Sequence, residues 1–550
     1  MSQETTTFGI DLGTTYSCIS YLKDGHPTVC LNLEGDRTTP SVVRMMIEDT
    51  VPVVGKTAKD TSVIYPDDTI QFVKSKIGKV ESFEIGQPDA RRTVTPEQVS
   101  SEILKKLASD AEKYTNMPVK DVVITVPAYF GYNEREATKR AGIEAGLNVI
   151  SIVEEPTAAA FYYLCEQDDT DATVCVYDLG GGTFDVTAIK KEGTAITCLT
   201  TDGDHDLGGK NWDQELIEHV LLRFREETGL EDEELDTDFL QELQIKCEEA
   251  KKQLSSAETA SITLKYDRQH MANITVSRSE FNDITSALLQ TTVELTRRVF
   301  DEVEGRGEKI DKLLLVGGSS KMPQVMEALN AEFGSRVDDI LINEPDESVS
   351  KGACIFCAWT LTHAQVDDAF SSQPNGGDGA SGDVITDINV NEENGEKIIT
   401  IASADTGESR KVVIPSIAGH ISEINIIATK SFGIKSIVDE KEVITNLIRK
   451  DQVLPAIFEH PFGTNTDNMT NVEIVLYQSE IKDEIYDLEY GIEIGRSVLD
   501  GLPTGLPAGS PVDIKIELNT EGIIVITGSY RGTPLKGSLN TNYAEGVGNQ

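Results

Sequence analysis

Two short segments combine glycine, threonine and aspartate in a pattern that suits phosphate and metal binding. In FGIDLGTTYSC, Asp11 and Gly13 lie between two apolar, strand-like runs, and VYDLGGGTFDV repeats this arrangement around Asp178 and Gly180. A tight turn between strands can direct several backbone N–H groups at one anion, and an aspartate at the strand end can hold hydrated Mg²⁺. Successive glycines cost backbone entropy that an ordinary connection does not need. The repeat therefore predicts a duplicated domain with one phosphate loop in each half.

A third glycine-rich element, LLLVGGSSKMPQV, joins a buried strand to the start of a helix at Gly317 and Gly318. A helix N-terminus of this kind suits the adenosine or phosphate end of a nucleotide. An ordinary turn would explain each element taken singly, but the three in this order favour a nucleotide site. Neither of the first two loops matches the G-x-x-x-x-G-K-[ST] or G-x-G-x-x-G pattern, which disfavours the P-loop and Rossmann classes.

The elements around these residues indicate the fold class. From Phe8 to about Thr362, strand-like runs alternate with helical ones, which predicts an α/β fold of mixed sheets covered by helices. The stretch from Ala364 to Asp383 is rich in Gly, Ser, Asp and Pro, as flexible connections are, and two short strands around the turn EENGEK follow it. Short β runs after Ile421 predict a β-sandwich. The predicted organisation is a first domain at 1–363, a connection with an inserted segment at 364–420, a sandwich at 421–541 and a tail at 542–550.

Composition and charge exclude several classes of protein. The 550 residues carry 93 Asp and Glu against 49 Lys and Arg, a formal net charge of −44. Such a chain repels nucleic acid and anionic membranes, so we expect neither as a partner. No apolar run reaches the roughly 18 residues that a membrane helix needs. The N-terminus MSQETTT lacks the basic region of a signal peptide, so a cytoplasmic location is expected.

The eight cysteines are scattered and lie mostly in apolar or β-branched stretches, which suits reduced, buried thiols. Cys354 and Cys357 form a C-x-x-C pattern, but no second pair lies nearby. We therefore interpret them as one face of a packed helix rather than as a metal or redox site.

The chain resembles the nucleotide-binding domain of the heat shock protein 70 chaperone family, within the actin and sugar-kinase superfamily. The resemblance covers nearly all of residues 8–362. It implies an actin-like (ribonuclease H-like) duplicated domain, followed by a β-sandwich substrate-binding domain. Actins and sugar kinases share the phosphate loops but lack EEPTAAA and CEEAKKQLSS. The matching segments are DLGTTYSC, VVITVPAYF, AGLNVISIVEEPTAAA, DLGGGTFDV, GDHDLGGKNWD, CEEAKKQLSS, LLLVGGSSKMPQV and PDESVSKGA.

The resemblance implies an ATPase that uses ATP, ADP and Mg²⁺, and it assigns roles to individual residues. Lys74 resembles the lysine that contacts the terminal phosphate, and Glu155 resembles the glutamate that helps to hold the attacking water. Asp11, Asp178 and, more weakly, Asp185 resemble the carboxylates that orient hydrated Mg²⁺. The first phosphate loop is matched by Gly13, Thr14, Thr15 and Tyr16, and the second by Gly180, Gly181, Gly182 and Thr183.

The adenosine end of the nucleotide is implied to lie among residues of two segments, CEEAKKQLSS and GGSSKMPQV. Lys252 and Lys321 stand where the family commonly has arginine, and lysine stacks on a purine less well than a planar guanidinium does. We therefore expect a weaker grip on adenine. The implied set is Glu248, Lys251, Lys252, Ser255, Gly317, Gly318, Ser319, Lys321 and Asp346.

The second domain resembles the family's peptide-binding sandwich more faintly. Pro127 and Arg135 match positions that couple the nucleotide state to this domain. The expected partners are unfolded or extended polypeptide, a J-domain co-chaperone and a nucleotide exchange factor. The interdomain linker is recognisable only as EINIIATKS, and no helical lid follows the sandwich, so peptide release should be fast. The implied groove residues, which are also explicable as plain core, are Ile434, Ile437, Phe462, Val472 and Ile474.

These features leave two functions open. The first is an ATP-dependent molecular chaperone that couples hydrolysis to the binding and release of unfolded polypeptide. The second is an ATP-binding co-chaperone or regulatory relative that hydrolyses little, which the altered linker and the two lysines favour. A small-molecule kinase of the same superfamily would need a hydroxyl-substrate pocket with a catalytic aspartate, and nothing in the sequence indicates one.

Overall fold

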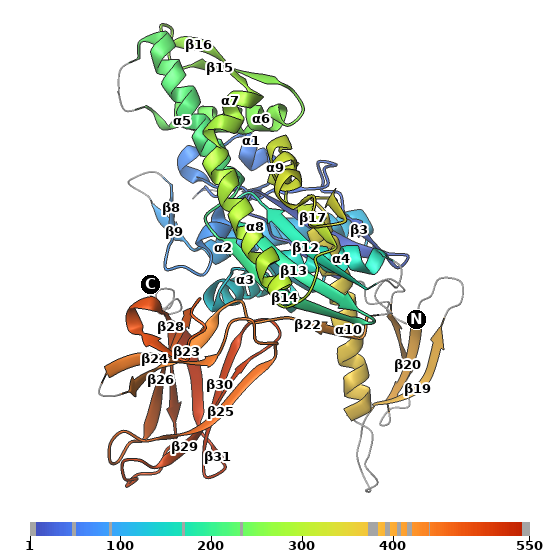
Figure 1. Cartoon of the computed structure of the whole chain (residues 1–550), viewed down its shortest axis with the longest axis vertical. Coiled ribbons are helices and arrows are strands. Elements are labelled where there is room, and N and C mark those ends of the chain that lie inside the picture. Colours follow the sequence, from blue (N-terminus) through green and yellow to red (C-terminus); the bar gives the residue numbers. More distant parts are fainter. Residues whose placement is uncertain are drawn as a thin grey trace.

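The computed structural model (Figure 1) describes residues 7–46, 51–86, 91–167, 171–230, 235–371, 383–390, 397–403, 409–414, 421–438 and 441–541. Of residues 364–371, 383–414 and 538–541 it describes at most the backbone. The predicted tail at 542–550 and much of the predicted flexible connection lie outside the described residues.

Two mixed sheets of the same design form the centre of the molecule. In the first lobe the order is β11-β10-β1-β2-β3, and in the second it is β18-β17-β12-β13-β14. In each sheet three strands run antiparallel as consecutive hairpins, and two further strands lie parallel to the first of them. The mixed α/β prediction is confirmed. The strands are β1 (Phe8–Asp11), β2 (Tyr16–Lys23), β3 (His26–Val29), β10 (Asp121–Val126), β11 (Asn148–Glu154), β12 (Ala172–Leu179), β13 (Phe184–Glu192), β14 (Ala195–Asp204), β17 (Lys312–Val316) and β18 (Asp339–Ile342).

Two helices, α4 (Glu155–Glu166) and α10 (Ser348–Ser371), pack against each other between the sheets. Their contact is close, because a β-carbon on Gly352 of α10 would lie 1.8 Å from the Ala158 carbonyl oxygen of α4. Cys354 and Cys357 are fully buried on α10, where their thiols donate to backbone carbonyl oxygens, and all eight cysteines are free and buried. α10 continues to Ser371, beyond the predicted start of the connection at Ala364, because no glycine or proline interrupts the helix there.

Further helices cover the outer faces of the sheets and extend each lobe upward (Figure 1). The first lobe adds α2 (Pro96–Thr115) and α3 (Tyr132–Glu144), with α1 (Lys56–Asp60), β4 (Thr39–Pro40), β5 (Val43–Arg44), β6 (Val53–Val54), β7 (Thr69–Ile70), β8 (Phe83–Ile85), β9 (Arg92–Val94) and the 3₁₀ turns η1 (Pro66–Asp68) and η2 (Val73–Lys76). The second lobe adds α8 (Ser286–Gly305), η3 (Gly318–Lys321) and α9 (Pro323–Phe333), with α5 (Gly209–Thr228), α6 (Thr237–Leu254), β15 (Thr259–Lys265), β16 (Met271–Ser277) and α7 (Arg278–Ile284).

The segment that follows α10 adds strands in two places. β19 (Asp383–Val390), β20 (Lys397–Ser403) and β21 (Ser409–Ile414) form an antiparallel three-stranded sheet, one strand more than predicted. β22 (Glu423–Asn425), at the start of the altered linker, then pairs in parallel with β14. The linker is therefore the edge strand of the second lobe's sheet.

Residues 431–541, which follow the linker and which we name the C-terminal β unit, contain two further antiparallel sheets with the orders β27-β24-β23-β26-β28-β32 and β25-β29-β30-β31. Alternate residues of β29, from Val512 to Leu518, are buried and share one hydrophobic cluster with residues of the other sheet. That cluster continues through the linker into α4 and α10. The strands and the single turn η4 are β23 (Ser431–Val438), β24 (Lys441–Ile448), β25 (Ala456–Gly463), β26 (Asn471–Ser479), β27 (Ile485–Asp487), η4 (Leu488–Tyr490), β28 (Ile492–Asp500), β29 (Pro511–Leu518), β30 (Ile524–Tyr530), β31 (Thr533–Pro534) and β32 (Lys536–Thr541).

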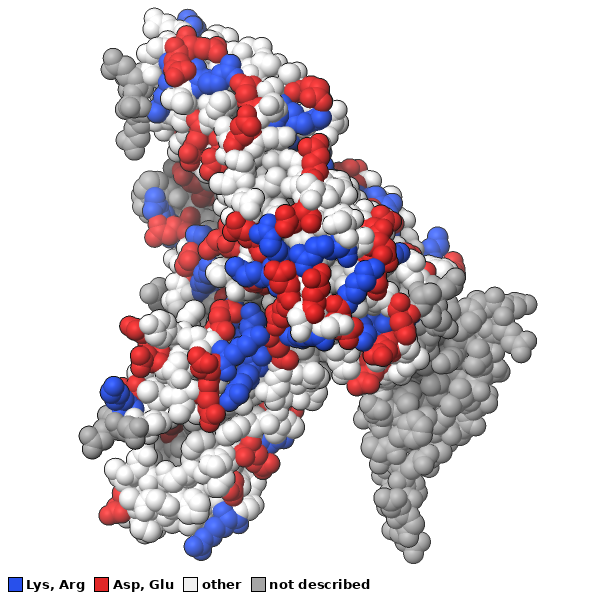
Figure 2. Space-filling model, viewed as in Figure 1, with Lys and Arg blue, Asp and Glu red and all other residues white. Residues whose placement is uncertain are grey.

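The surface carries both signs of charge in spite of the net charge of −44. On the face shown in Figure 2, acidic and basic side chains lie interspersed over the two lobes. Of the helices that the structure describes, none has the length and apolar character to cross a membrane.

Candidate nucleotide site

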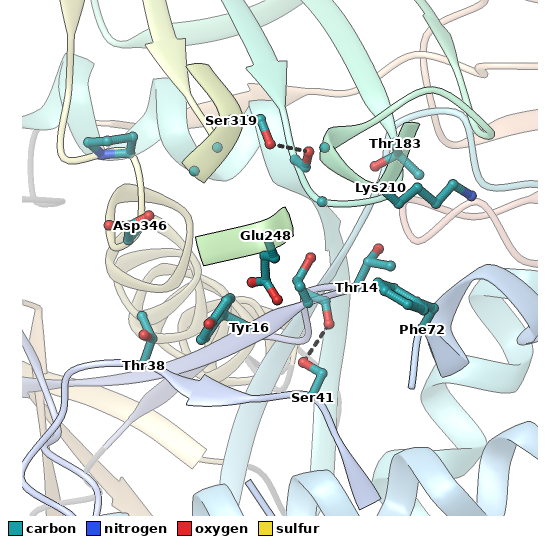
Figure 3. A pocket seen from close by; sticks show the side chains of 18 of the residues that line it. Thr14, Tyr16, Thr38, Ser41, Phe72, Thr183, Lys210, Glu248, Ser319 and Asp346 are labelled. Carbon is teal, nitrogen blue, oxygen red and sulfur yellow. Dashed lines mark hydrogen bonds between the residues drawn. The ribbon is translucent and has the colours of Figure 1, made fainter. Parts of the chain in front are cut away.

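A cavity of about 460 Å³ lies between the two lobes, and we name it the cleft cavity (Figure 3). Both strand turns, η2, η3 and α6 contribute to its lining. Of the predicted catalytic and ATP-binding residues, only Gly182 is missing from the lining. The lining therefore includes Asp11, Gly13, Thr14, Thr15, Tyr16, Lys74, Glu155, Asp178, Gly180, Gly181, Thr183, Glu248, Lys251, Lys252, Ser255, Gly317, Gly318, Ser319, Lys321 and Asp346.

The two turns of the duplicated design touch each other across the cleft. A β-carbon on Gly181 would lie 1.6 Å from the Thr15 hydroxyl oxygen, and one on Gly182 would lie 2.6 Å from the Thr14 methyl carbon. Any side chain at these positions would force the lobes apart. Gly182 thus packs against the opposite turn, which explains its absence from the cavity lining.

The third glycine-rich element is anchored to the second turn. Gly317 has a φ of 80°, and a β-carbon there would lie 2.4 Å from the Leu179 carbonyl oxygen, so both backbone conformation and space require glycine. The Ser319 hydroxyl donates to the Gly180 carbonyl oxygen at 3.0 Å (Figure 3). The element at Gly317 therefore fixes the position of the glycine-rich turn that begins at Gly180.

Lys74 and Glu155 form a buried ion pair at one end of the cleft cavity. Lys74 lies in η2, its side chain is 4% exposed, and Glu155 is the first residue of α4. The turn before Lys74 is tight, since Phe72 adopts a left-handed φ of 56°. Thr14 lies beside Phe72 in Figure 3, and both residues line the cleft cavity.

Burial raises the pKa values of the carboxyl groups near this ion pair. It raises the pKa of Asp11 to about 7, with a smaller contribution from the charge of Glu155. The pKa of Asp178 is raised well above its ordinary value for the same reasons. Burial also raises the pKa of Asp185 to about 8, although this carboxylate accepts a hydrogen bond from the Tyr129 N–H at 3.1 Å. The carboxylates outnumber the one lysine, so a bound cation would stabilise their ionised forms.

The carboxylates suit a hydrated rather than a directly coordinated metal ion. Within the described ranges, no group of three or more His, Cys, Asp and Glu side chains is placed to hold a metal ion. Mg²⁺ usually keeps several waters and is held by one or two carboxylates together with phosphate oxygens. Asp11 and Asp178, which line the cavity beside both turns, fit that arrangement.

The opposite end of the cavity is closed by a charged bridge that the sequence did not reveal. Lys59 of α1 lies 2.7 Å from a Glu248 carboxylate oxygen and 3.1 Å from the Tyr16 hydroxyl, so it spans the two lobes. Lys252 also contacts both Glu248, at 2.6 Å, and the Tyr16 hydroxyl, at 2.9 Å. Burial would raise the pKa of Glu248, but the two lysines outweigh it and lower this pKa to about 2.

The remaining cations at this end are held by neighbouring acids. Lys251 donates to the Gly209 carbonyl oxygen at 2.9 Å and to Asp213 at 2.8 Å, and Lys321 forms an ion pair with Asp346. The two lysines that replace the family's arginines, Lys252 and Lys321, have side chains 52% and 46% exposed. Both ammonium groups therefore lie at the solvent-facing end of the cleft cavity, which we call its mouth.

Several other lining residues were not predicted. Lys59 comes from a segment in which no pattern was recognised. Gln71 and Phe72 lie just before Lys74, and Lys210 and Asp213 lie within the matched segment GDHDLGGKNWD, but none of these four residues was assigned a role. The matched segments could therefore have pointed to these four, whereas only the fold brings Lys59 to the cleft.

Neither of the two predicted coupling residues lines the cleft cavity, and Arg135 contacts the C-terminal β unit. Arg135 is buried, and it donates to Glu154 at 2.8 Å and to the Glu521 carbonyl oxygen at 3.4 Å. Pro127 directly follows β10, and its carbonyl oxygen accepts from the Phe130 N–H at 3.1 Å. Arg135 is thus no surface residue but a link between the first lobe and the C-terminal β unit.

The five predicted groove residues do not share one surface. Ile434 and Ile474 are buried in the cluster between the two C-terminal sheets, and Phe462 and Val472 pack against that cluster. Ile437 is 71% exposed, because it lies three positions after Ile434 on the same strand and therefore points to the other face. The prediction of one groove lined by all five is wrong for the described structure.

The family model described as Hsp70 protein matches residues 7–371, more than half of the chain. The match covers both central sheets, the cleft cavity and α10.

Proposed function

The chain belongs to the Hsp70 family, and we propose that this chaperone hydrolyses ATP between its two lobes and couples hydrolysis to the binding and release of unfolded polypeptide. One observation carries the proposal. One end of a single cavity is lined by both turns, by the Lys74–Glu155 ion pair and by the carboxylates Asp11 and Asp178. The predicted adenosine contacts line the rest of the same cavity.

The chemistry needs little more than positioning and charge neutralisation, since phosphoryl transfer to water has a loose transition state. Lys74 would contact the terminal phosphate, and Glu155 and Thr183 would orient the attacking water. Asp11 and Asp178 would hold hydrated Mg²⁺, which neutralises the phosphate charges. The backbone N–H groups of the turns at Gly13 to Tyr16 and Gly180 to Gly182 are suited to the remaining phosphate oxygens.

Coupling to the C-terminal β unit has a short physical route. Glu521 contacts Arg135, Arg135 holds Glu154, and Glu154 precedes the Glu155 that pairs with Lys74. A change in how the C-terminal β unit is seated would therefore reach the Lys74 end of the cleft through three contacts. A J-domain partner and a nucleotide exchange factor are expected to act on the same cycle.

A regulatory protein with little hydrolysis is the second candidate. It is favoured by Lys252 and Lys321, whose flexible ammonium groups grip a purine less well than arginine, and by the groove residues that do not line a common surface.

The chaperone ATPase and the regulatory protein are distinguished by steady-state ATP hydrolysis of the full chain, measured with and without an unstructured hydrophobic peptide. Lys74→Ala is expected to lower kcat by at least about 100-fold while ATP still binds, because positioned charge supplies most of the catalysis. Lys76→Ala is the matched control, since Lys76 lies outside the cleft cavity and pairs with exposed Glu81. Peptide stimulation that Lys74→Ala abolishes supports the chaperone ATPase, and ATP binding without turnover supports the regulatory protein.

A further inference from the structure

A second cavity, also of about 460 Å³, lies between the nucleotide-binding lobes and the C-terminal β unit, and we name it the interdomain cavity. It shares Thr14, Lys74 and Thr183 with the cleft cavity. The two cavities therefore meet at the Lys74 end of the cleft, where the proposed function places the terminal phosphate.

The interdomain cavity contains polar groups that lack a close hydrogen-bond or ion-pair partner among the described residues. The charge of Lys430 is balanced by an ion pair with Glu480, and its ammonium nitrogen lies 3.5 Å from the centre of the Tyr129 ring. Lys79 forms an ion pair with no residue of the described ranges. One buried carboxylate oxygen of Glu134 likewise has no hydrogen-bond partner there. A cation and a polar acceptor are thus left for a ligand or water.

The cavity reaches solvent on the side of the C-terminal β unit. Tyr490 and Ile492 line it and are 60% and 66% exposed. Gln478 and Ser479 at the end of β26 form part of the same wall. The seating of the C-terminal β unit therefore sets the width of this opening.

The other way out of the cleft is obstructed once ADP is bound. Hydrolysis breaks the bond between the second and third phosphates and leaves ADP between the Lys74 end and the mouth, where Lys59, Glu248 and Lys252 bridge the lobes. The turns on the two sides also touch at Gly181 and Thr15. A freed phosphate would have to pass ADP or separate the lobes to leave that way.

We propose that inorganic phosphate leaves the cleft through the interdomain cavity, with Lys79 as the cation that binds it in transit. The proposal rests on the proposed ATP hydrolysis. The C-terminal β unit forms one wall of the path, so the rate of phosphate release would depend on how that unit is seated. No bond forms or breaks in this step.

The groups that face Lys79 set the electrostatics of the path. Glu134 and Glu480 oppose an anion, whereas Lys79 and Lys430 attract it. Glu480 is neutralised by Lys430 and Lys450. Burial raises the pKa of the Glu134 carboxyl, which brings it closer to its neutral form.

Single-turnover kinetics with Mg·ATP tests the proposal. Cleavage is followed by acid quench, and release is followed with a fluorescent phosphate-binding protein. In Lys79→Ala, cleavage should stay close to the wild-type rate while release slows by about fivefold, the effect of removing one charge beside the path. Lys79→Arg should restore release. Lys76→Ala, on the same segment but outside both cavities, should release phosphate at the wild-type rate.

A second variant distinguishes an effect of charge on phosphate release from an effect of packing. Glu134→Gln keeps the shape of the side chain and removes its charge, so release should be as fast as in the wild type or faster. Equal release rates in Lys79→Ala and the wild-type protein would overturn the proposal, as would equal slowing in Lys76→Ala or in Glu134→Gln.

A titration of inorganic phosphate into the protein with Mg·ADP keeps this test independent of turnover. Lys79→Ala should weaken phosphate binding by about fivefold, and Lys76→Ala should not. If the protein cleaves no ATP but shows this difference, the proposed hydrolysis fails and the phosphate site stands. Equal phosphate affinities in the wild type and Lys79→Ala overturn the site whether or not ATP is cleaved.

Discussion

At the Lys74 end of the cleft, buried carboxylates gather without enough positive charge to balance them. Burial alone disfavours the ionised forms of Asp11, Asp178 and Asp185, and Lys74 is already paired with Glu155. Such an arrangement costs stability in the free protein and favours ligands that bring a cation. The unbalanced carboxylates thus lower the stability of the free protein and raise its affinity for Mg·nucleotide.

This imbalance predicts how stability depends on pH. The pKa values of Asp11 and Asp185 are raised from 3.8 to about 7 and about 8, so the folded protein keeps protons that the unfolded chain has lost. The free energy of unfolding of the nucleotide-free protein should therefore fall as pH rises from 6 to 8, by at most about 1.4 kcal/mol per pH unit for each group. Urea unfolding of the wild type and of Asp185→Asn at a series of pH values measures this.

Asp185→Asn is expected to flatten the slope, because the amide does not titrate and can still accept from the Tyr129 N–H. Every other titratable side chain is the same in the two proteins. Identical slopes would mean that Asp185 ionises normally in the folded protein.

Lys59 yields a second prediction at the scale of single residues. Its contacts with Glu248 and Tyr16 join α1 to α6 across the mouth of the cleft. Lys59→Met should speed ADP dissociation by about 5–30-fold, the equivalent of 1–2 kcal/mol for partly buried, charge-assisted hydrogen bonds. Stopped-flow release of a fluorescent ADP analogue measures this rate.

Lys56→Met is the control for that experiment, since Lys56 is exposed on the same short helix and does not line the cleft cavity. Similar dissociation rates in the wild type and Lys59→Met would show that Lys59 does not hold the mouth closed.

At the scale of elements, the three-residue strand β22 connects the lobes to the C-terminal β unit. Its pairing with β14 is parallel, with Ile424 opposite Ile196, and the Ser422 N–H donates to the Thr194 carbonyl oxygen at 2.9 Å. An edge strand this short is held mainly by its ladder, so it can detach without unfolding the sheet. The linker is therefore suited to report the nucleotide state to the second unit.

Ile424→Pro should release this strand, because proline lacks the N–H group and has a fixed φ. We expect faster hydrogen exchange of the backbone amides of Glu423 and Asn425, which the variant keeps, and a loss of most peptide stimulation, with basal ATP hydrolysis little changed. Ser422→Ala is the control, since it removes only the exposed hydroxyl contact to Thr194. Unchanged exchange in Ile424→Pro would show that pairing with β14 does not hold the linker.

At the scale of the whole molecule, the glycine patterns predicted the centre of the fold, and the reason is physical. Gly181, where the two turns meet, and Gly317, which lies against Leu179, leave no room for a side chain, so glycine at these positions is a direct signal of close backbone approach. Lys59 could not be found in this way, because its helix is five residues long and only the closed cleft brings it to Glu248.

The C-terminal β unit was harder to predict for another reason. Its strands contain register shifts, as between Phe432 and Gly433 and between Leu476 and Tyr477. Each shift moves the following side chains relative to those of the paired strand, so which residues lie opposite one another depends on pairings that are remote in sequence.

The contact between the two units leads to the last prediction. Lys139 of α3 lies 2.5 Å from a Glu521 carboxylate oxygen, and both side chains are largely shielded from solvent. Reversing either charge should repel the units, whereas the double variant Lys139→Glu, Glu521→Lys should restore attraction, because the Arg135 contact is to the Glu521 backbone and survives the exchange. Fluorescence energy transfer between labels on the two units measures their separation, and ATP hydrolysis with peptide measures their coupling.

A double variant as impaired as either single variant would show that this ion pair does not seat the C-terminal β unit. Recovery of both signals would show that the Lys139–Glu521 ion pair controls both the interdomain cavity and the cleft. The C-terminal β unit, which Glu521 anchors, also forms the wall beside Lys79.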